Sequence, residues 1–196
     1  MVPGGSTRTR TQKLVCHLAT NTSLDPIPHL TCVGHTHQEI ESLLQAYSDA
    51  KIDNILALRG DEPMSGPTEG DFRYAADLVD AIRQFPDSSF GIGVAGFPEG
   101  HPETPNRLVQ MDHLKAKVDR GVDWICTQLF FDNRAYFDWL ERCDLAGIQT
   151  PTIAGTVYHP IPVEMLYIGT DEWKDLSKEA VQFSPFSGTE GAPDGG

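Results

Sequence analysis

The chain has 196 residues, which is enough for one domain with a sizeable core. Its 28 acidic and 15 basic residues give a formal net charge of -13, which argues against a nucleic-acid backbone or an anionic membrane surface as the main partner. The four cysteines lack zinc-ligand spacing, and no apolar run reaches the roughly 18 residues of a membrane span or forms a signal-peptide core, so we expect a cytoplasmic protein with reduced thiols and no metal site.

Helix-like and strand-like stretches alternate along the chain, a pattern typical of an α/β fold with parallel strands. The first predicted elements are a helix over 11–19, a strand over 27–33, a helix over 36–47, a strand over 54–58 and a helix over 72–85. The second helix has the clearest signal. Thr36 and Glu39 have capping-box spacing, and apolar residues then repeat with the helical period from Ile40 to Tyr47.

The alternation continues through the second half of the chain. The predicted elements are a strand over 90–97, a helix over 108–118, a strand over 123–131, a helix capped by Asp132 or Asn133 and ended by Gly147, and a fifth strand over 150–155. Gly91, Gly93 and Gly96 match a dinucleotide-binding pattern, but prolines follow them instead of a helix. We therefore predict strand glycines that neighbouring groups or a ligand approach closely.

Polar residues end the apolar run over 54–58. In parallel α/β folds the carboxyl ends of the strands carry the chemistry, so Arg59, Gly60 and Asp61 indicate an enzyme. One interpretation of this tripeptide is a simple turn with a local ion pair between Arg59 and Asp61. The other is that the Asp61 carboxylate orients and polarises a heterocyclic ligand.

Four further polar side chains have two interpretations each. Gln128 interrupts an apolar run, and an unpaired buried amide costs about 1 to 3 kcal/mol, so a backbone group or a ligand must satisfy it. His29 is either a core histidine bonded to the backbone or a cofactor contact. His101 either caps its loop or contacts a ligand. Lys117, late in a helix, either favours the negative end of that helix or binds a ligand.

Five motifs occur in one order along the chain. They are Pro28-His29-Leu30-Thr31-Cys32, Leu58-Arg59-Gly60-Asp61 with Pro63, Phe97-Pro98-Glu99-Gly100-His101-Pro102-Glu103, Lys115-Ala116-Lys117-Val118-Asp119 and Thr127-Gln128-Leu129-Phe130-Phe131-Asp132. Together they resemble the methylenetetrahydrofolate reductase family. The resemblance runs collinearly from about Gly4 to Gly155.

The resemblance implies a flavoprotein with a (β/α)₈ TIM barrel that moves a hydride from NADH or NADPH through FAD to 5,10-methylenetetrahydrofolate. The product would be 5-methyltetrahydrofolate, in one-carbon metabolism and methionine biosynthesis. The implied FAD contacts are His29, Arg59, Gly60, Asp61, Tyr74, Ala75, Phe97, His101, Thr104, His113 and Lys117. Asp61 and Gln128 would face the folate, Asp61 as a catalytic residue, and Phe97 would pack on the flavin where relatives often have tyrosine.

Some features of the family do not occur in this sequence. The first family strand carries a general-acid glutamate, in a Phe-Glu-Phe-Phe-Pro-Pro-like motif, and the second carries Thr-Tyr-Gly. We therefore expect strands three to six of the eight-stranded barrel, in a partial TIM-barrel reductase domain over 1–160. A divergent tail over 161–196 is expected to be disordered from about Ser184, because it is poor in apolar residues.

Three hypotheses about function follow. The first is a methylenetetrahydrofolate reductase. The second is a truncated, non-catalytic remnant that binds flavin weakly or associates with another chain. The third is an unrelated barrel enzyme that uses Asp61 as an acid or base without flavin. The sequence leaves open the choice between NADH and NADPH, and also whether the chain forms a homo-oligomer.

Overall fold

The computed structural model describes residues 5–61, 66, 69–86 and 89–155, with side chains from Arg10 onward. Its elements in chain order are α1 (Gly5–Asn21), β1 (His29–Thr31), α2 (His37–Asp49), β2 (Asn54–Leu58), α3 (Ala75–Gln84), β3 (Gly91–Gly96), α4 (Arg107–Val118), β4 (Trp124–Thr127), α5 (Asn133–Leu145) and β5 (Thr152–Ile153). The predicted tail over 161–196 and its expected disorder lie outside the described residues.

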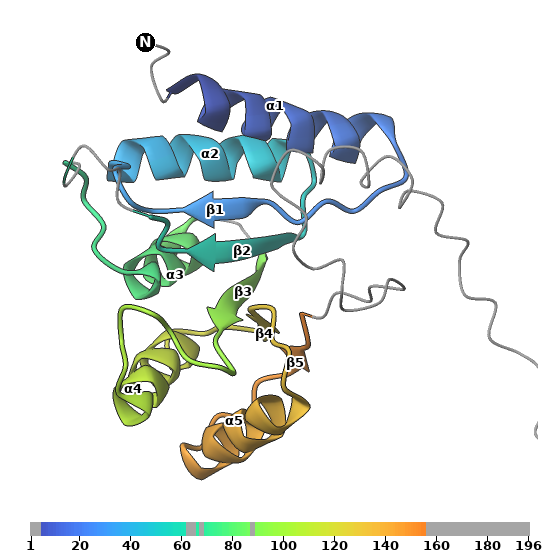
Figure 1. Ribbon diagram of the computed structural model, residues 1–196. Coiled ribbons are helices and arrows are strands. Elements are labelled where there is room, and N and C mark those ends of the chain that lie inside the picture. Colours follow the sequence, from blue (N-terminus) through green and yellow to red (C-terminus); the bar gives the residue numbers. More distant parts are fainter. Residues whose placement is uncertain (1–4, 62–65, 67–68, 87–88, 156–196) are drawn as a thin grey trace, which may run out of the picture. The chain divides into compact units, whose positions relative to one another are not determined.

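The five strands form one parallel sheet in the order β1-β2-β3-β4-β5, and a helix connects each strand to the next. Figure 1 shows α2 to α5 following one another along one side of this sheet, with α1 lying on α2. Within the described part of the chain β1 and β5 each have one neighbouring strand, so the sheet is not closed. The structure confirms an α/β fold with the winding of a partial (β/α)₈ barrel.

The number of strands differs from the predicted interval. Strands three to six would be four strands, whereas the described residues contain five. The five strands lie in the five runs predicted as strands, over 27–33, 54–58, 90–97, 123–131 and 150–155, so an interval of four strands was one too few.

Two strands are shorter than predicted, because the chain turns away from the ladder near their carboxyl ends. The run over 27–33 gives only β1, because the backbone N–H of Val33 turns to donate to the Arg59 carbonyl at 2.9 Å. The run over 123–131 ends at Thr127. The next N–H, that of Gln128, still donates to the Gly96 carbonyl at 2.7 Å before the chain leaves the sheet.

The glycines of β3 allow large aromatic side chains to approach the sheet. A Cβ atom on Gly93 would lie 2.3 Å from the ring of Trp124, its register neighbour on β4. A Cβ atom on Gly96 would lie 2.7 Å from the ring of Trp139, which α5 buries in the core. The predicted close approach to these strand glycines is confirmed, and the approaching groups are tryptophans.

Two helix starts agree closely with the sequence pattern. At α2 the Thr36 hydroxyl accepts the Glu39 N–H at 3.3 Å, and the Glu39 carboxylate accepts the Thr36 N–H at 2.8 Å, so the capping box is confirmed. At α5 the Asp132 carboxylate accepts the Arg134 N–H at 2.9 Å, so Asp132 is the cap. Among the described residues no helix has the length and apolar content that crossing a bilayer requires.

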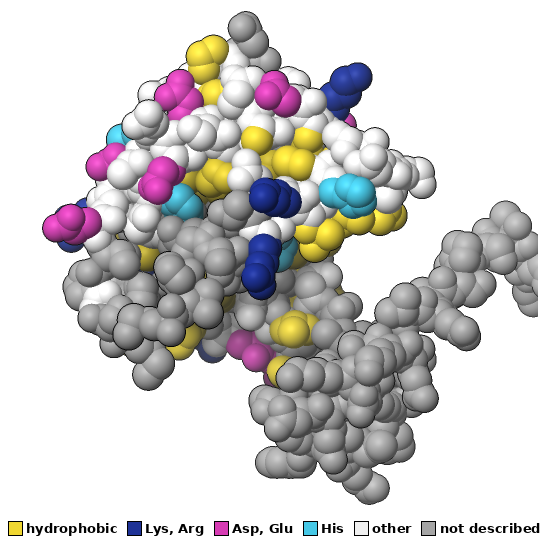
Figure 2. Space-filling model, turned by 90° about the horizontal axis from the view of Figure 1, so that it is seen from above, with side chains coloured by type: hydrophobic (Ala, Val, Ile, Leu, Met, Phe, Trp, Pro, Cys, Tyr) yellow, Lys and Arg dark blue, Asp and Glu magenta, His cyan; other side chains and the backbone are white. Residues whose placement is uncertain are grey.

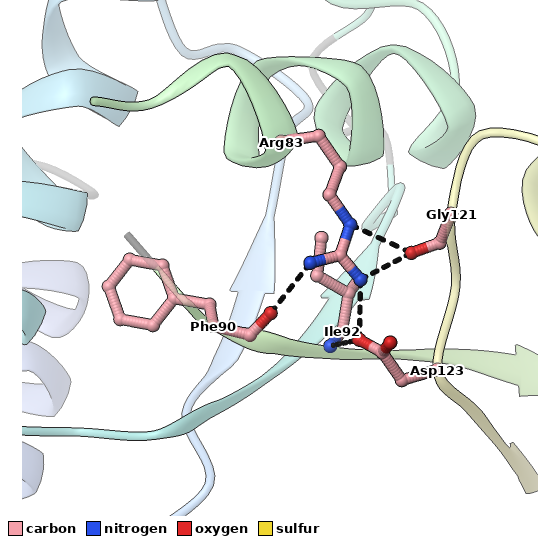
Figure 3. A network of polar contacts seen from close by, with 5 residues as sticks. All are labelled: Arg83, Phe90, Ile92, Gly121 and Asp123. Carbon is pink, nitrogen blue, oxygen red and sulfur yellow. Dashed lines mark hydrogen bonds and ion pairs between the residues drawn. The ribbon is translucent and has the colours of Figure 1, made fainter. Parts of the chain in front are cut away.

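Arg83, near the end of α3, joins that helix to β3 and β4 where these strands begin (Figure 3). Its guanidinium donates through Nε to the Gly121 carbonyl at 2.8 Å and through Nη1 to the Phe90 carbonyl at 2.9 Å, and it pairs with Asp123. The Asp123 carboxylate in turn accepts the Ile92 N–H at 2.7 Å. This network, which we call the Arg83 clamp, fixes the end of the sheet opposite the strands' carboxyl ends.

Candidate active site

Seven of the predicted site residues follow the carboxyl ends of three adjacent strands. They are Arg59, Gly60 and Asp61 after β2, Phe97, His101 and Thr104 after β3, and Gln128 after β4. Because β2, β3 and β4 are parallel neighbours, these segments leave the same edge of the sheet. That edge is where active sites of such folds lie.

The Arg59 guanidinium is half-buried and pairs with Glu103, from the segment after β3, with 2.6 Å between Nη2 and Oε2. The predicted local pair between Arg59 and Asp61 is therefore wrong, and Asp61 is exposed. Gly60 has φ +85°, and a Cβ atom there would lie 2.9 Å from Thr31 Cβ. Only glycine fits this turn without strain, which brings the backbone close to whatever binds above it.

The segment after β3 folds around His101. The imidazole packs edge-on against Phe97, with ring centroids 4.6 Å apart, and its Nδ1 accepts the Glu103 N–H at 3.1 Å. A neutral ring with Nδ1 as acceptor carries its proton on Nε2. The backbone N–H of Thr104 donates to the His101 carbonyl at 3.0 Å, so Phe97, His101 and Thr104 are held as one unit.

Lys117 reaches from α4 to the sheet. Its Nζ donates to the Ala95 carbonyl of β3 at 3.1 Å, so its contact is with the strand that leads to Phe97. The side chain is half-buried, but its ammonium end is enclosed by protein atoms, and this burial lowers the pKa of Lys117 to about 8. At neutral pH the group still carries a positive charge.

The Gln128 side chain is exposed, although it was predicted to be buried. It lies beyond the end of β4, so the inference of a buried amide in need of a partner is wrong. The buried polar residue at this strand end is Thr127, whose hydroxyl accepts the Gly155 N–H at 2.8 Å. Gln128 is instead free to meet a ligand.

Four other predicted FAD contacts make no described interaction with the site residues that follow β2, β3 and β4. His29 is exposed at the start of β1, in register with Leu56, so the alternative of a core histidine is wrong. Tyr74 is the exposed N-cap of α3, and Ala75 is the first residue of that helix. His113 is exposed on α4.

Glu99 and Glu103 have structural roles that were not predicted, although both belong to the motif that runs from Phe97 to Glu103. Glu103 is the partner of Arg59. Glu99 Oε1 accepts the backbone N–H groups of Phe131 at 2.8 Å and of Asp132 at 3.1 Å. The one available signal was two acidic residues in a short loop after a strand, a position where carboxylates often serve the site.

The sequence is similar to those of several known proteins. The chain is 38% identical over 160 residues to methylenetetrahydrofolate reductase 2 of Saccharomyces cerevisiae, covering 79% of this chain and 26% of that protein. It is 39% identical over 149 residues to 5,10-methylenetetrahydrofolate reductase of Escherichia coli, covering 76% of this chain and 49% of that protein. The chain thus spans about half or less of the length of these relatives.

Among solved structures, phosphonopyruvate hydrolase superposes with a TM-score of 0.54 at 10% identity, covering 88% of this chain and 75% of that one, a likeness of fold alone. Residues 2–163 match the sequence profile of the family described as methylenetetrahydrofolate reductase. This match extends past Gly155, where the resemblance was predicted to end, and it excludes an unrelated barrel enzyme. The chain belongs to the methylenetetrahydrofolate reductase family.

Proposed function

We propose that this chain takes part in the flavin-dependent reduction of 5,10-methylenetetrahydrofolate to 5-methyltetrahydrofolate, with NADH or NADPH as hydride donor. The observation that supports the proposal most strongly is the convergence of Arg59, Phe97, His101 and Gln128 on the carboxyl ends of β2 to β4 in a member of this family. FAD, when bound, would supply the hydride transfer.

The side chains at this edge suit FAD in charge and shape. Arg59 and Lys117 are cations, which favour a diphosphate group. Phe97 offers an aromatic face held by His101, and Gly60 lets the ligand approach the backbone. In this proposal these residues bind and orient the cofactor.

The folate would meet the remaining polar groups. Asp61 is exposed where β2 ends, and its carboxylate would stabilise positive charge that develops on the pterin. The exposed Gln128 amide has both a donor and an acceptor for the edge of a heterocycle. We assign Asp61 the catalytic role and Gln128 a binding role.

A second candidate is a chain that binds flavin, or associates with another chain, without catalysis. The sheet formed by the described residues has two edge strands, β1 and β5, and this favours the candidate. In that case the residues around Arg59 and Lys117 would bind the cofactor without turnover.

The two candidates differ in what happens after FAD is added to the purified chain. The first candidate requires that NADH or NADPH be oxidised with a quinone acceptor, and that methylenetetrahydrofolate also accept the hydride. Asp61→Asn should then lower folate reduction about 10²-fold and lower flavin binding and quinone-coupled oxidation much less. Equal losses in the two assays would contradict the role given to Asp61.

Binding of the cofactor is checked separately. Lys117→Ala should raise the dissociation constant for FAD about tenfold, since it removes a charge-assisted contact, whereas Lys115→Ala should not change it. Lys115 is the matched control because it lies on the same helix and pairs with Asp119. Flavin binding without any oxidation of NADH or NADPH would favour the second candidate. Absence of flavin binding would refute the first candidate and also the flavin-binding version of the second.

A further inference from the structure

Glu99 joins the segment after β3 to the segment after β4. Its Oε1 accepts two consecutive backbone N–H groups, those of Phe131 at 2.8 Å and Asp132 at 3.1 Å. Bonds from N–H groups to a carboxylate are about twice as strong as those between neutral groups. Asp132 also caps α5, so Glu99 fixes the point at which this helix begins.

The backbone that carries Glu99 is itself rigid. The Gly100 N–H donates to the Phe97 carbonyl at 3.1 Å, which closes a tight turn, and Gly100 has φ +107°. The Pro98 side chain is fully buried beneath this turn. Glu99 is thus presented from a fixed position next to Phe97, the predicted flavin contact.

Residues 128–132, the segment that Glu99 holds, make several fixed contacts and yet expose apolar side chains. The backbone N–H of Gln128 donates to the Gly96 carbonyl. Phe130 is buried and stacked on Tyr136 with ring centroids 4.7 Å apart. Leu129 is nevertheless 41% exposed and Phe131 is 79% exposed. An exposed aromatic ring on a segment whose backbone is held in place is suited to stacking on a planar ligand.

We infer that Glu99 is a positioning residue that holds residues 129–132 so that Phe131 forms an apolar wall for the planar ring of the folate. The inference rests on the proposed function for the identity of the ligand. Glu99 itself touches neither reacting atom. It acts by fixing two backbone groups that would otherwise move with the start of α5.

The test uses the full chain loaded with FAD, and 5-methyltetrahydrofolate as the probe in calorimetry. Glu99→Ala should raise the dissociation constant for the folate about tenfold, because two hydrogen bonds to a charged group are lost. Glu99→Gln keeps an oxygen acceptor at the same place and should stay within about threefold of the unaltered chain. The control Glu141→Ala, at an exposed position on α5, should change nothing.

Two further readouts separate positioning from general loss of structure. The dissociation constant for FAD should be the same in all three variants. Phe131→Ala should weaken folate binding by itself, and adding Glu99→Ala to it should have little further effect, since both act through one contact. Equal weakening by Glu99→Gln and Glu99→Ala, or none in either, would overturn the inference.

Hydrogen exchange distinguishes this inference from the proposed function. The amides of Phe131 and Asp132 should exchange faster in Glu99→Ala than in Glu99→Gln, whether or not a ligand is present. If the unaltered chain binds no folate, the proposed function fails, and the exchange rates alone then decide the positioning role. Unchanged exchange in Glu99→Ala would refute that role.

Discussion

At the residue scale, Lys117 has the lowered pKa that burial of an ammonium group produces. The charged form has lost much of its water, and its described hydrogen bond is to the Ala95 carbonyl. Such a group costs stability while it is charged. The same charge is the one that we propose for binding the FAD diphosphate, so the site keeps a destabilising charge for its function.

This burial predicts how stability changes with pH. The pKa of Lys117 is about 8 in the folded chain and 10.5 in the unfolded chain, so between these values the unfolded state binds more protons. The contribution of Lys117 to the free energy of unfolding should therefore rise with pH across this window, whereas the thiols of Cys32 and Cys143, whose pKa values burial raises to about 11, make contributions that fall. Lys117→Met should remove about 1 kcal/mol or more of this rise, measured by urea unfolding at both ends of the window.

Lys115→Met is the control for that measurement. Lys115 lies on the same helix and forms an i,i+4 pair with Asp119 in a partly exposed position. Lys115→Met should leave the pH dependence of the free energy of unfolding nearly unchanged. If Lys117→Met and Lys115→Met gave the same pH dependence, the Lys117 ammonium would have to be solvated.

At the scale of elements, the Arg83 clamp joins α3 to the starts of β3 and β4. One guanidinium serves two carbonyls and a carboxylate, and the carboxylate of Asp123 serves the Ile92 N–H (Figure 3). A planar fork of five donors can do this, whereas a lysine ammonium has no such geometry. The clamp thus fixes how α3, β3 and β4 are spaced. It does so at the end of the sheet opposite the candidate site.

Removal of the clamp should destabilise the fold without touching the site. Arg83→Met should lower the free energy of unfolding by about 2 kcal/mol, because several bonds to a charged donor are lost at once. Arg107→Met is the matched control, since Arg107 pairs with Asp138 at 3.4 Å and both side chains are more than half exposed. Urea unfolding followed by circular dichroism measures both. Equal effects would mean that the clamp contributes no more than a surface pair.

At the scale of the whole molecule, the sheet of the described residues has two edge strands, β1 and β5. Ile153, on the edge strand β5, is 54% exposed and in register with Cys126. Hydrophobic side chains are also exposed among charged and histidine side chains on the side seen from above in Figure 2. Closed barrels have no such edges, because each strand has two neighbours.

The open edges predict association in solution. Size-exclusion chromatography of the chain should show species larger than a monomer, in proportions that rise with protein concentration. Ile153→Lys places a charge on the edge strand and should shift the distribution toward the monomer. Leu14→Lys, at a similarly exposed position on α1, should leave it unchanged. A monomer at every concentration would contradict the prediction.

Features of the fold that depend on local sequence could be predicted from the sequence. Alternating patterns gave every strand and helix, and the spacing of Thr36 and Glu39 gave a capping box that the structure confirms. The motifs after β2, β3 and β4 could be placed at one edge because each parallel strand is followed by its loop at the same end. Strand ends were less certain, since they depend on where the chain turns away from the ladder, as at Val33, whose N–H donates to the Arg59 carbonyl.

Contacts between distant segments were decided only by the tertiary structure. Arg59 pairs with Glu103, Lys117 reaches Ala95, and Glu99 holds Phe131. In each case a long side chain could reach several charged side chains or backbone groups, and the sequence gives no distance between them. The sequence determined which residues lie at the carboxyl ends of the strands, through a period set by local backbone geometry. Packing of helices on the sheet decided which of these residues touch, because it depends on the summed contacts of the whole core.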